Sequence, residues 1–238
     1  MSAAATLESR AAPRPLSDYR YYNLLVHAFV VVLIISNLVA PKITRLGPLT
    51  LSGAQLLFPV TYIFGDIFTE VYGYAGSRRA IWVGFFASAL LAVTGMIVVA
   101  LPPAPGWEGQ QAFETVFNFV PRLVVASLIA YWAGEFANSF VLSRMKLWTG
   151  GRFLWMRTIG STVVGQAVDT VIVIVLVFGG TLPVEMLLKL IGSGYFSKVL
   201  YEAVATPLTY VVVGALKRGE GVDVFDTQTD YNPFRTDT

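Results

Sequence analysis

Six ionisable side chains lie within stretches of the chain that are otherwise apolar. They are Asp66, Glu70, Glu135, Asp169, Lys198 and Glu202, and their neighbours are mostly Val, Leu, Ile, Ala and Phe. A charge at the centre of a membrane helix costs at least ~2.5–3.5 kcal/mol. Several such charges in one small chain therefore indicate a polar site enclosed by membrane helices.

The spacing of the first two acids places them on one helical face. Asp66 and Glu70 are four residues apart, and Tyr62 flanks the same face. Like charges this close repel, so either one acid is protonated or both bind a shared cation. A structural alternative for Glu70 is an ion pair with Arg78 or Arg79 at the cytoplasmic end of its helix.

Two further pairs of polar residues are each spaced three apart, near the middle of two later helices. The first is Glu135 with Asn138, and the second is Gln166 with Asp169. We expect these four side chains to bind a polar solute. The alternative is that they form hydrogen bonds between helices, as amides commonly do in membranes.

The last apolar stretch carries Lys198 and Glu202, four residues apart. Arg157, which begins the stretch before it, is a further candidate for a structural ion pair or a proton-carrying role. Lys198 and Glu202 are predicted to neutralise each other within one helix, which would explain how the lysine is tolerated. Because burial disfavours a carboxylate's charge, Glu70 and Glu202 are also candidate proton carriers. Phe58 and Tyr62 are candidates for stacking on a planar ligand.

The composition bounds the classes of protein that are possible. The 238 residues are 55% hydrophobic and 13% charged, against roughly 25% charged in a soluble domain. The net charge of +2 gives no indication of a nucleic-acid partner. With no cysteine and only His27, the sequence offers no disulfide, thiol nucleophile or zinc site. We expect no metal, no cofactor and no enzymatic activity.

The apolar runs predict an all-α, polytopic membrane protein with six transmembrane helices. The runs span residues 22–40, 51–72, 80–101, 123–142, 158–179 and 194–216. A kink or break is expected at Pro59 or Gly65, a short amphipathic piece around Phe113, and a short interfacial helix over residues 183–191. We expect residues 1–20 to form a disordered cytoplasmic tail, residues 21–218 the transmembrane domain, and residues 219–238 a cytoplasmic tail.

The distribution of lysine and arginine predicts the orientation, because cytoplasmic loops are enriched in both. Eleven such residues fall on one side of the predicted topology, namely Arg10, Arg14, Arg20, Arg78, Arg79, Arg144, Lys146, Arg152, Arg157, Lys217 and Arg218. The other side has four, namely Lys42, Arg45, Arg122 and Lys189. Both termini are therefore expected in the cytoplasm.

Four blocks together resemble the bacterial queuosine precursor transporter family, also called the vitamin uptake transporter family. They are FPVTYIFGDIFTEVYGYAGSRRAIWVGF (58–85), GEFANSFVLSRMK (134–146), RTIGSTVVGQAVDT (157–170) and KVLYEAVATPLTYVVVGALKRGEGVDVFD (198–226), followed by DTQTDYNPF (226–234). The blocks occur in the right order over nearly the whole folded chain. One position departs from the pattern, since Gln166 stands where a Glu is frequent in the family.

The resemblance implies a multi-pass importer in the cell inner membrane that takes up deazaguanine bases for queuosine salvage. Its substrates would be 7-cyano-7-deazaguanine and the 7-aminomethyl form. The ring N–H and exocyclic amine of such a base suit a carboxylate, for which Asp66, Glu135 and Asp169 are the candidates. Asn138 or Gln166 would then donate to the base carbonyl. Expected partners are the base, the lipid bilayer and, as one option, a second copy of the chain in a homodimer.

Two other classes of function compete with this interpretation. Small six-helix membrane proteins also serve as substrate-capture subunits of energy-coupling-factor transporters, for a vitamin or a nucleobase. The sequence has no Walker motif, so such a subunit would need a separate ATPase. An intramembrane enzyme is disfavoured, because the sequence contains no HExxH motif and no nucleophile–base set.

Overall fold

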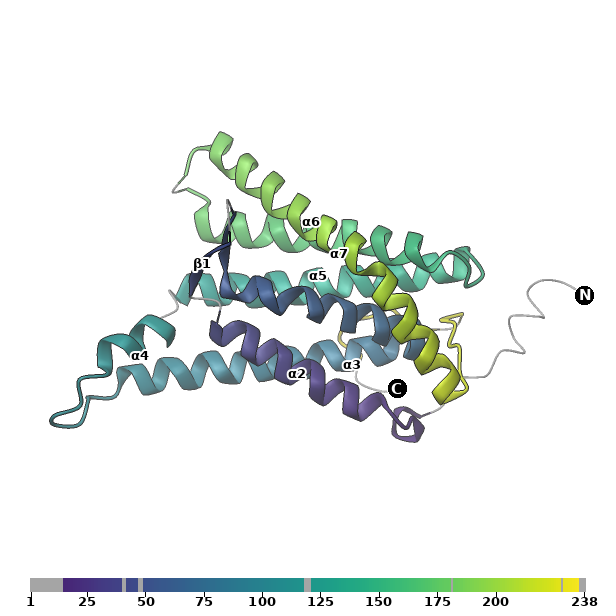
Figure 1. The fold of residues 1–238 in the computed structure, drawn as a ribbon, viewed down its shortest axis with the longest axis horizontal. Coiled ribbons are helices and arrows are strands. Elements are labelled where there is room, and N and C mark those ends of the chain that lie inside the picture. Colours follow the sequence, from purple (N-terminus) through teal and green to yellow (C-terminus); the bar gives the residue numbers. More distant parts are fainter. Residues whose placement is uncertain are drawn as a thin grey trace, which may run out of the picture.

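Helices form nearly all of the regular structure of the protein (Figure 1). The computed structural model describes residues 15–39, 42–46, 49–117, 121–180, 182–227 and 229–235. Within these residues the elements are η1 (Leu16–Asp18), α2 (Tyr22–Val39), β1 (Ile43–Leu46), β2 (Leu49–Ser52), η2 (Gly53–Leu56), α3 (Phe58–Ala100), α4 (Gln110–Phe117), α5 (Pro121–Trp148), α6 (Leu154–Phe178) and α7 (Val184–Glu220). The predicted all-α class is confirmed, with one small antiparallel hairpin, β1–β2, as an addition.

Five helices of the described chain are long and apolar enough to cross a membrane. They are Tyr22–Val39, Val60–Ala100, Val125–Trp148, Leu154–Leu176 and Leu187–Glu220. The second and third predicted runs both fall within α3, which consists of two helices joined at a kink. With 43 residues, α3 has about twice the length of one crossing. The start of the second run was also placed too early, since residues 51–56 belong to β2 and η2.

The chain reverses direction inside α3, at Gly73. This residue has φ 77° and ψ 176°, a combination that is essentially open only to glycine. Figure 1 shows the two halves of α3 running back along each other. Phe29 of α2 confirms the reversal, because its ring packs on Phe68 in the first half (5.8 Å between centroids) and lies 2.8 Å from where a Cβ on Gly84 would be in the second. The bundle therefore contains six helical segments of alternating direction.

Three other local predictions have mixed outcomes. The short helix predicted around Phe113 is confirmed as α4, where Phe113 packs against Phe117 at 4.6 Å between centroids. A separate interfacial helix over residues 183–191 is wrong, because α7 runs without interruption from Val184. The break predicted at Pro59 or Gly65 lies at Gly73 instead, since Pro59 occupies the first turn of α3, where proline needs no backbone donor.

The segment after α7 packs against the end of the bundle at which α3 reverses. We call residues 222–227 and 229–234 the C-terminal segment. Asp226 accepts hydrogen bonds from the backbone N–H of Tyr74 (3.1 and 3.0 Å) and from Ser143 Oγ (2.6 Å). Arg78 donates to two backbone carbonyls of this segment, and Trp82 Nε1 donates to the carbonyl of Pro233. The predicted N-terminal tail is described only from Pro15, and there Leu16 and Tyr19 are already buried.

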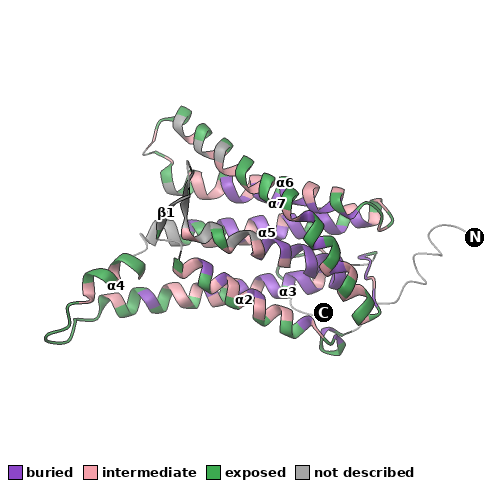
Figure 2. Ribbon diagram, in the orientation of Figure 1, coloured by how far each residue is buried: buried purple, intermediate pink, exposed green. Residues whose placement is uncertain are grey.

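Burial is uneven along the bundle. Figure 2 shows the buried residues concentrated towards the end where the C-terminal segment packs. In α6 the last fully buried described residue is Thr170, and in α7 the first is Glu202. The second half of α6 and the first half of α7 therefore contribute few residues to the tightly packed part of the protein.

Candidate functional site

Polar side chains from four helices meet inside the packed part of the bundle. We call this group the central cluster. Its members are Tyr62 and Asp66 of α3, Glu135 and Asn138 of α5, Gln166 and Asp169 of α6, and Glu202 of α7, and all seven are buried. So many enclosed polar groups are unfavourable in a membrane protein unless they serve one another or a ligand.

Two glycines bring α5 and α6 close enough to form this cluster. A Cβ on Gly134 would lie 2.8 Å from the Cβ of Asp169 and 3.1 Å from the carbonyl oxygen of Gly165. A Cβ on Gly165 would lie 2.8 Å from the Cβ of Asn138. Small residues allow helix backbones to approach in membranes. This close contact sets Glu135 and Asn138 beside Gln166 and Asp169.

Asp66 is engaged by two neighbours. Asn138 Nδ2 donates to Asp66 Oδ1 at 3.0 Å. The carboxyl group of Glu202 lies close to that of Asp66, across the contact between α7 and α3. Two ionised carboxylates at such close range would repel each other.

Glu135 stands in a different environment from Asp66. Its side chain lies against the backbone of α3, where a Cβ on Gly65 would be 2.7 Å from Glu135 Oε2. The residue is 1% exposed, and neither carboxylate oxygen has a hydrogen-bond partner among the described residues. The amide oxygens of Asn138 and Gln166 also lack a partner within the described chain. The cluster thus contains several unused acceptors.

Asp169 and Lys198 form an ion pair between α6 and α7. Lys198 Nζ lies 2.5 Å from Asp169 Oδ2, and the two side chains are 18% and 9% exposed. The pair lies where α6 and α7 leave the packed part of the bundle. The side chains of Tyr62 and Gln166, also in the cluster, lie close to each other.

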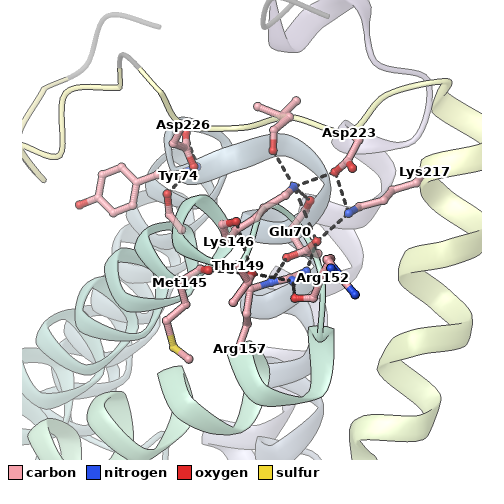
Figure 3. A network of polar contacts seen from close by, with 12 residues as sticks. Glu70, Tyr74, Met145, Lys146, Thr149, Arg152, Arg157, Lys217, Asp223 and Asp226 are labelled. Atoms are coloured by element: carbon pink, nitrogen blue, oxygen red, sulfur yellow. Dashed lines mark hydrogen bonds and ion pairs between the residues drawn. The ribbon is translucent and has the colours of Figure 1, made fainter. Parts of the chain in front are cut away.

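A second group of charges lies at the end of the bundle near the C-terminal segment (Figure 3). We call Glu70, Lys146, Arg157, Lys217 and Asp223 the ion-pair network. Glu70 Oε1 lies 2.7 Å from Arg157 Nη2, 2.6 Å from Lys217 Nζ and 3.6 Å from Lys146 Nζ. Asp223 Oδ1 pairs with Lys146 at 2.9 Å and with Lys217 at 2.7 Å. One network therefore joins α3, α5, α6, α7 and the C-terminal segment.

Backbone carbonyls complete the environment of the buried cations. Lys146 Nζ donates to the carbonyl oxygens of Glu70 (2.6 Å) and Val224 (2.5 Å). Arg157 Nη1 donates to the carbonyl oxygen of Arg152 and to Thr149 Oγ1. These contacts replace the water that both cations lose on burial, which makes the network a structural element rather than an empty binding site.

Comparison with known proteins identifies the class of protein to which this site belongs. The family described as "putative vitamin uptake transporter" matches residues 52–212. The chain belongs to this transporter family. It is accordingly a multi-pass membrane protein of a transport family and not an enzyme. The matched residues include the central cluster and most of the ion-pair network.

Individual relatives agree with the family match. A "probable queuosine precursor transporter" of Bacillus subtilis (strain 168) is 32% identical over 178 residues, which cover 74% of this chain and 77% of the relative. A "queuosine precursor transporter" of Escherichia coli (strain K12) is 27% identical over 154 residues, covering 63% and 66%. No solved structure matches the chain.

The transporter's structure brings together most of the residues that the sequence singled out. Six of the seven predicted substrate-binding residues lie in the central cluster, namely Asp66, Glu135, Asn138, Gln166, Asp169 and Tyr62. The side chain of Phe58 lies outside the described residues, although its backbone begins α3. Glu202 also belongs to the cluster, whereas the sequence predicted that it would pair with Lys198.

Two predicted ion pairs of the transporter are wrong. Lys198 is paired with Asp169 rather than with Glu202, because its side chain reaches across to α6 instead of along its own helix. Glu70 is paired with Arg157, Lys146 and Lys217 rather than with Arg78 or Arg79. The reversal at Gly73 turns the second half of α3 away, and Arg78 there binds carbonyls of the C-terminal segment.

Sequence reasoning missed three members of the ion-pair network: Lys146, Lys217 and Asp223. Lys146 and Arg157 were counted as loop charges, but both are 1% exposed. One signal could have indicated their burial, since an acid inside α3 with no basic residue on its own helix face needs partners from other helices. The sequence alone does not show which helices bring those partners.

Proposed function

We propose that this protein is an inner-membrane importer of queuosine precursors, that is, of deazaguanine bases. The substrates are 7-cyano-7-deazaguanine and its 7-aminomethyl relative, used for queuosine salvage in tRNA modification. Two relatives that together match most of the chain carry the name queuosine precursor transporter, which supports this substrate class.

The proposal rests mainly on the hydrogen-bond acceptors of the central cluster that have no partner among the described residues. A guanine-like base presents a ring N–H and an exocyclic amine side by side, and both are donors. The unpartnered oxygens of Glu135, Asn138 and Gln166 suit such an edge. Tyr62 belongs to the same cluster and is the candidate for stacking on the ring. The base would bind between α3, α5, α6 and α7.

We further propose that the chain crosses the membrane six times with both termini in the cytoplasm. The two halves of α3 supply two crossings, and α2, α5, α6 and α7 supply the others. This arrangement places the ion-pair network at the cytoplasmic end, where it holds four helices together. The Lys198–Asp169 pair then lies towards the outside, at the less packed end of α6 and α7.

The competing function is that of a substrate-capture subunit for an energy-coupling-factor transporter. Such a subunit binds its ligand alone but needs an ATPase module for uptake. Purified protein in liposomes separates the two functions. Uptake of radiolabelled 7-cyano-7-deazaguanine by liposomes that contain only this protein supports the importer, whereas binding without uptake supports the capture subunit.

A binding panel tests the substrate class directly. Calorimetry with 7-cyano-7-deazaguanine, the aminomethyl form, guanine and several vitamins should give the tightest binding for the two deazaguanines. Tighter binding of a vitamin would overturn the proposed substrate. The same liposomes, with and without an imposed pH gradient, test whether the Asp66–Glu202 pair couples uptake to protons. Accumulation above equilibrium only with the gradient means coupling, and equal initial rates mean a passive carrier.

A further inference from the structure

Three carboxylates of the central cluster could in principle accept the donor edge of a base. They are Asp66, Glu135 and Asp169, and sequence alone gives no reason to choose among them. Their surroundings in the structure differ sharply. Asp169 is paired with Lys198 at 2.5 Å, and Asp66 accepts a hydrogen bond from Asn138 at 3.0 Å.

Glu135 alone of these three has both oxygens unused within the described chain. It is 1% exposed, so its oxygens are shielded from bulk water. Burying a carboxylate without donors is strongly unfavourable. In a transporter, such a side chain is a candidate for binding a substrate that carries hydrogen-bond donors.

Two features of the packed helices bear on ligand binding at Glu135. Gly65 leaves space for the carboxylate against the α3 backbone, because any larger residue would place a Cβ 2.7 Å from Oε2. The hydroxyl groups of Tyr131 and Thr162 are buried, have no hydrogen-bond partner among the described residues and can donate. The packed part of the bundle thus contains one free carboxylate together with hydroxyl groups able to donate to a ligand.

We propose that Glu135 is the specificity-determining residue, which accepts the ring N–H and the exocyclic amine of the deazaguanine through its two oxygens. This inference rests on the proposed function. Asp66 and Asp169 position the helices around the ligand through Asn138, Glu202 and Lys198, and they do not read the base edge. Removal of the exocyclic amine from the ligand should then weaken binding only in protein that retains Glu135.

The test is a cycle of two ligands and two proteins, measured by calorimetry on purified full-length chain. The ligands are 7-cyano-7-deazaguanine and the same compound without its 2-amino group, and the proteins are wild type and Glu135→Gln. Wild type should prefer the 2-amino compound by about tenfold or more, because one charge-assisted hydrogen bond is lost without it. In Glu135→Gln the preference should fall to about onefold.

Control variants distinguish recognition of the base by Glu135 from a general effect of the substitution on structure. Asp169→Asn should weaken binding of both ligands while keeping the wild-type preference between them. Glu135→Asp retains a carboxylate one methylene shorter, and it should keep a reduced preference where Glu135→Gln has none. If Glu135→Gln fails to fold, the inference is decided on Glu135→Asp, whose unchanged preference would overturn it.

The outcomes distinguish this inference from the proposed function. An undiminished preference for the 2-amino compound in Glu135→Gln would refute the role of Glu135 while leaving the substrate class intact. Failure of wild-type protein to bind any deazaguanine would overturn both, because the inference depends on that ligand.

Discussion

Arg157 binds Glu70 through two nitrogens of its guanidinium group, with Nη2 2.7 Å from Oε1 and Nε 3.3 Å from Oε2. Such a two-point contact fixes the geometry as well as the charge. Both residues are fully buried, and Lys217 adds a third short contact at 2.6 Å. The carboxylate of Glu70 therefore joins α6 and α7 to α3.

Replacement of Glu70 by glutamine should destabilise the folded protein strongly. Glu70→Gln leaves three cations without their shared carboxylate, and breaking a buried ion pair by removal of one partner costs ~3–5 kcal/mol. The matched control is Glu185→Gln, which breaks the exposed Lys189–Glu185 pair and should cost at most ~0.5 kcal/mol. Thermal unfolding in detergent measures both. Equal effects for the two variants would contradict a structural role for the network.

Asp223 should make stability depend on pH in the acid range. Burial alone would raise the pKa of Asp223, but Lys146 and Lys217 hold that pKa below its ordinary value. The contribution of a group with a lowered pKa is complete above the unfolded pKa of about 3.9 and is lost as pH falls through the folded pKa. The stability difference between wild type and Asp223→Asn should therefore be constant above about pH 5 and shrink below about pH 4. A stability difference between the two proteins that grows as pH falls would contradict this prediction.

The reversal in α3 should depend on glycine at position 73. Gly73→Ala forces a side chain into a backbone conformation that costs ~1–3 kcal/mol. Its Cβ would also lie 2.9 Å from Asp226 Oδ1 and from Val224 Cγ1. Gly192→Ala is the control, because Gly192 lies inside α7 with nothing within 4 Å of its Cβ position and should be neutral or stabilising. Chemical denaturation of the purified variants would show the contrast, and equal stabilities would contradict it.

The proposed topology can be tested by cysteine labelling, because the chain has no native cysteine. Glu108 and Arg152 are both exposed and lie on loops at opposite ends of the bundle. In intact cells a membrane-impermeant maleimide should label Glu108→Cys, and it should label Arg152→Cys only after permeabilisation. Labelling of both variants in intact cells would rule out the six-crossing arrangement.

The sequence predicted which residues share a helix face far better than it predicted their partners. The spacing of Glu135 with Asn138, and of Gln166 with Asp169, follows directly from helical geometry, and all four lie in one cluster. Partner choice depends on how helices pack, which local spacing does not contain. Lys198 is four residues from Glu202, yet it pairs with Asp169 because α6 lies within reach.

The position of the chain reversal, at Gly73, could not be predicted from the sequence for a similar reason. Prolines and glycines are frequent in membrane helices, and Pro59 and Gly65 looked equally able to interrupt the second run. Contacts with the C-terminal segment distinguish Gly73, since Asp226 binds the N–H of the next residue. That segment lies far along the chain and was predicted as a tail, so no local pattern pointed to it.

The contact between Asp226 and Tyr74 also sets an order of events during synthesis. Asp226 caps the first N–H after the reversal, but it is added 152 residues later. At a translation rate of about 5–20 residues per second, the ribosome needs roughly 8–30 s to supply this cap. Both halves of α3 are therefore synthesised before the contact that secures their junction exists. A segment made after every helix of the bundle thus completes a helix made early.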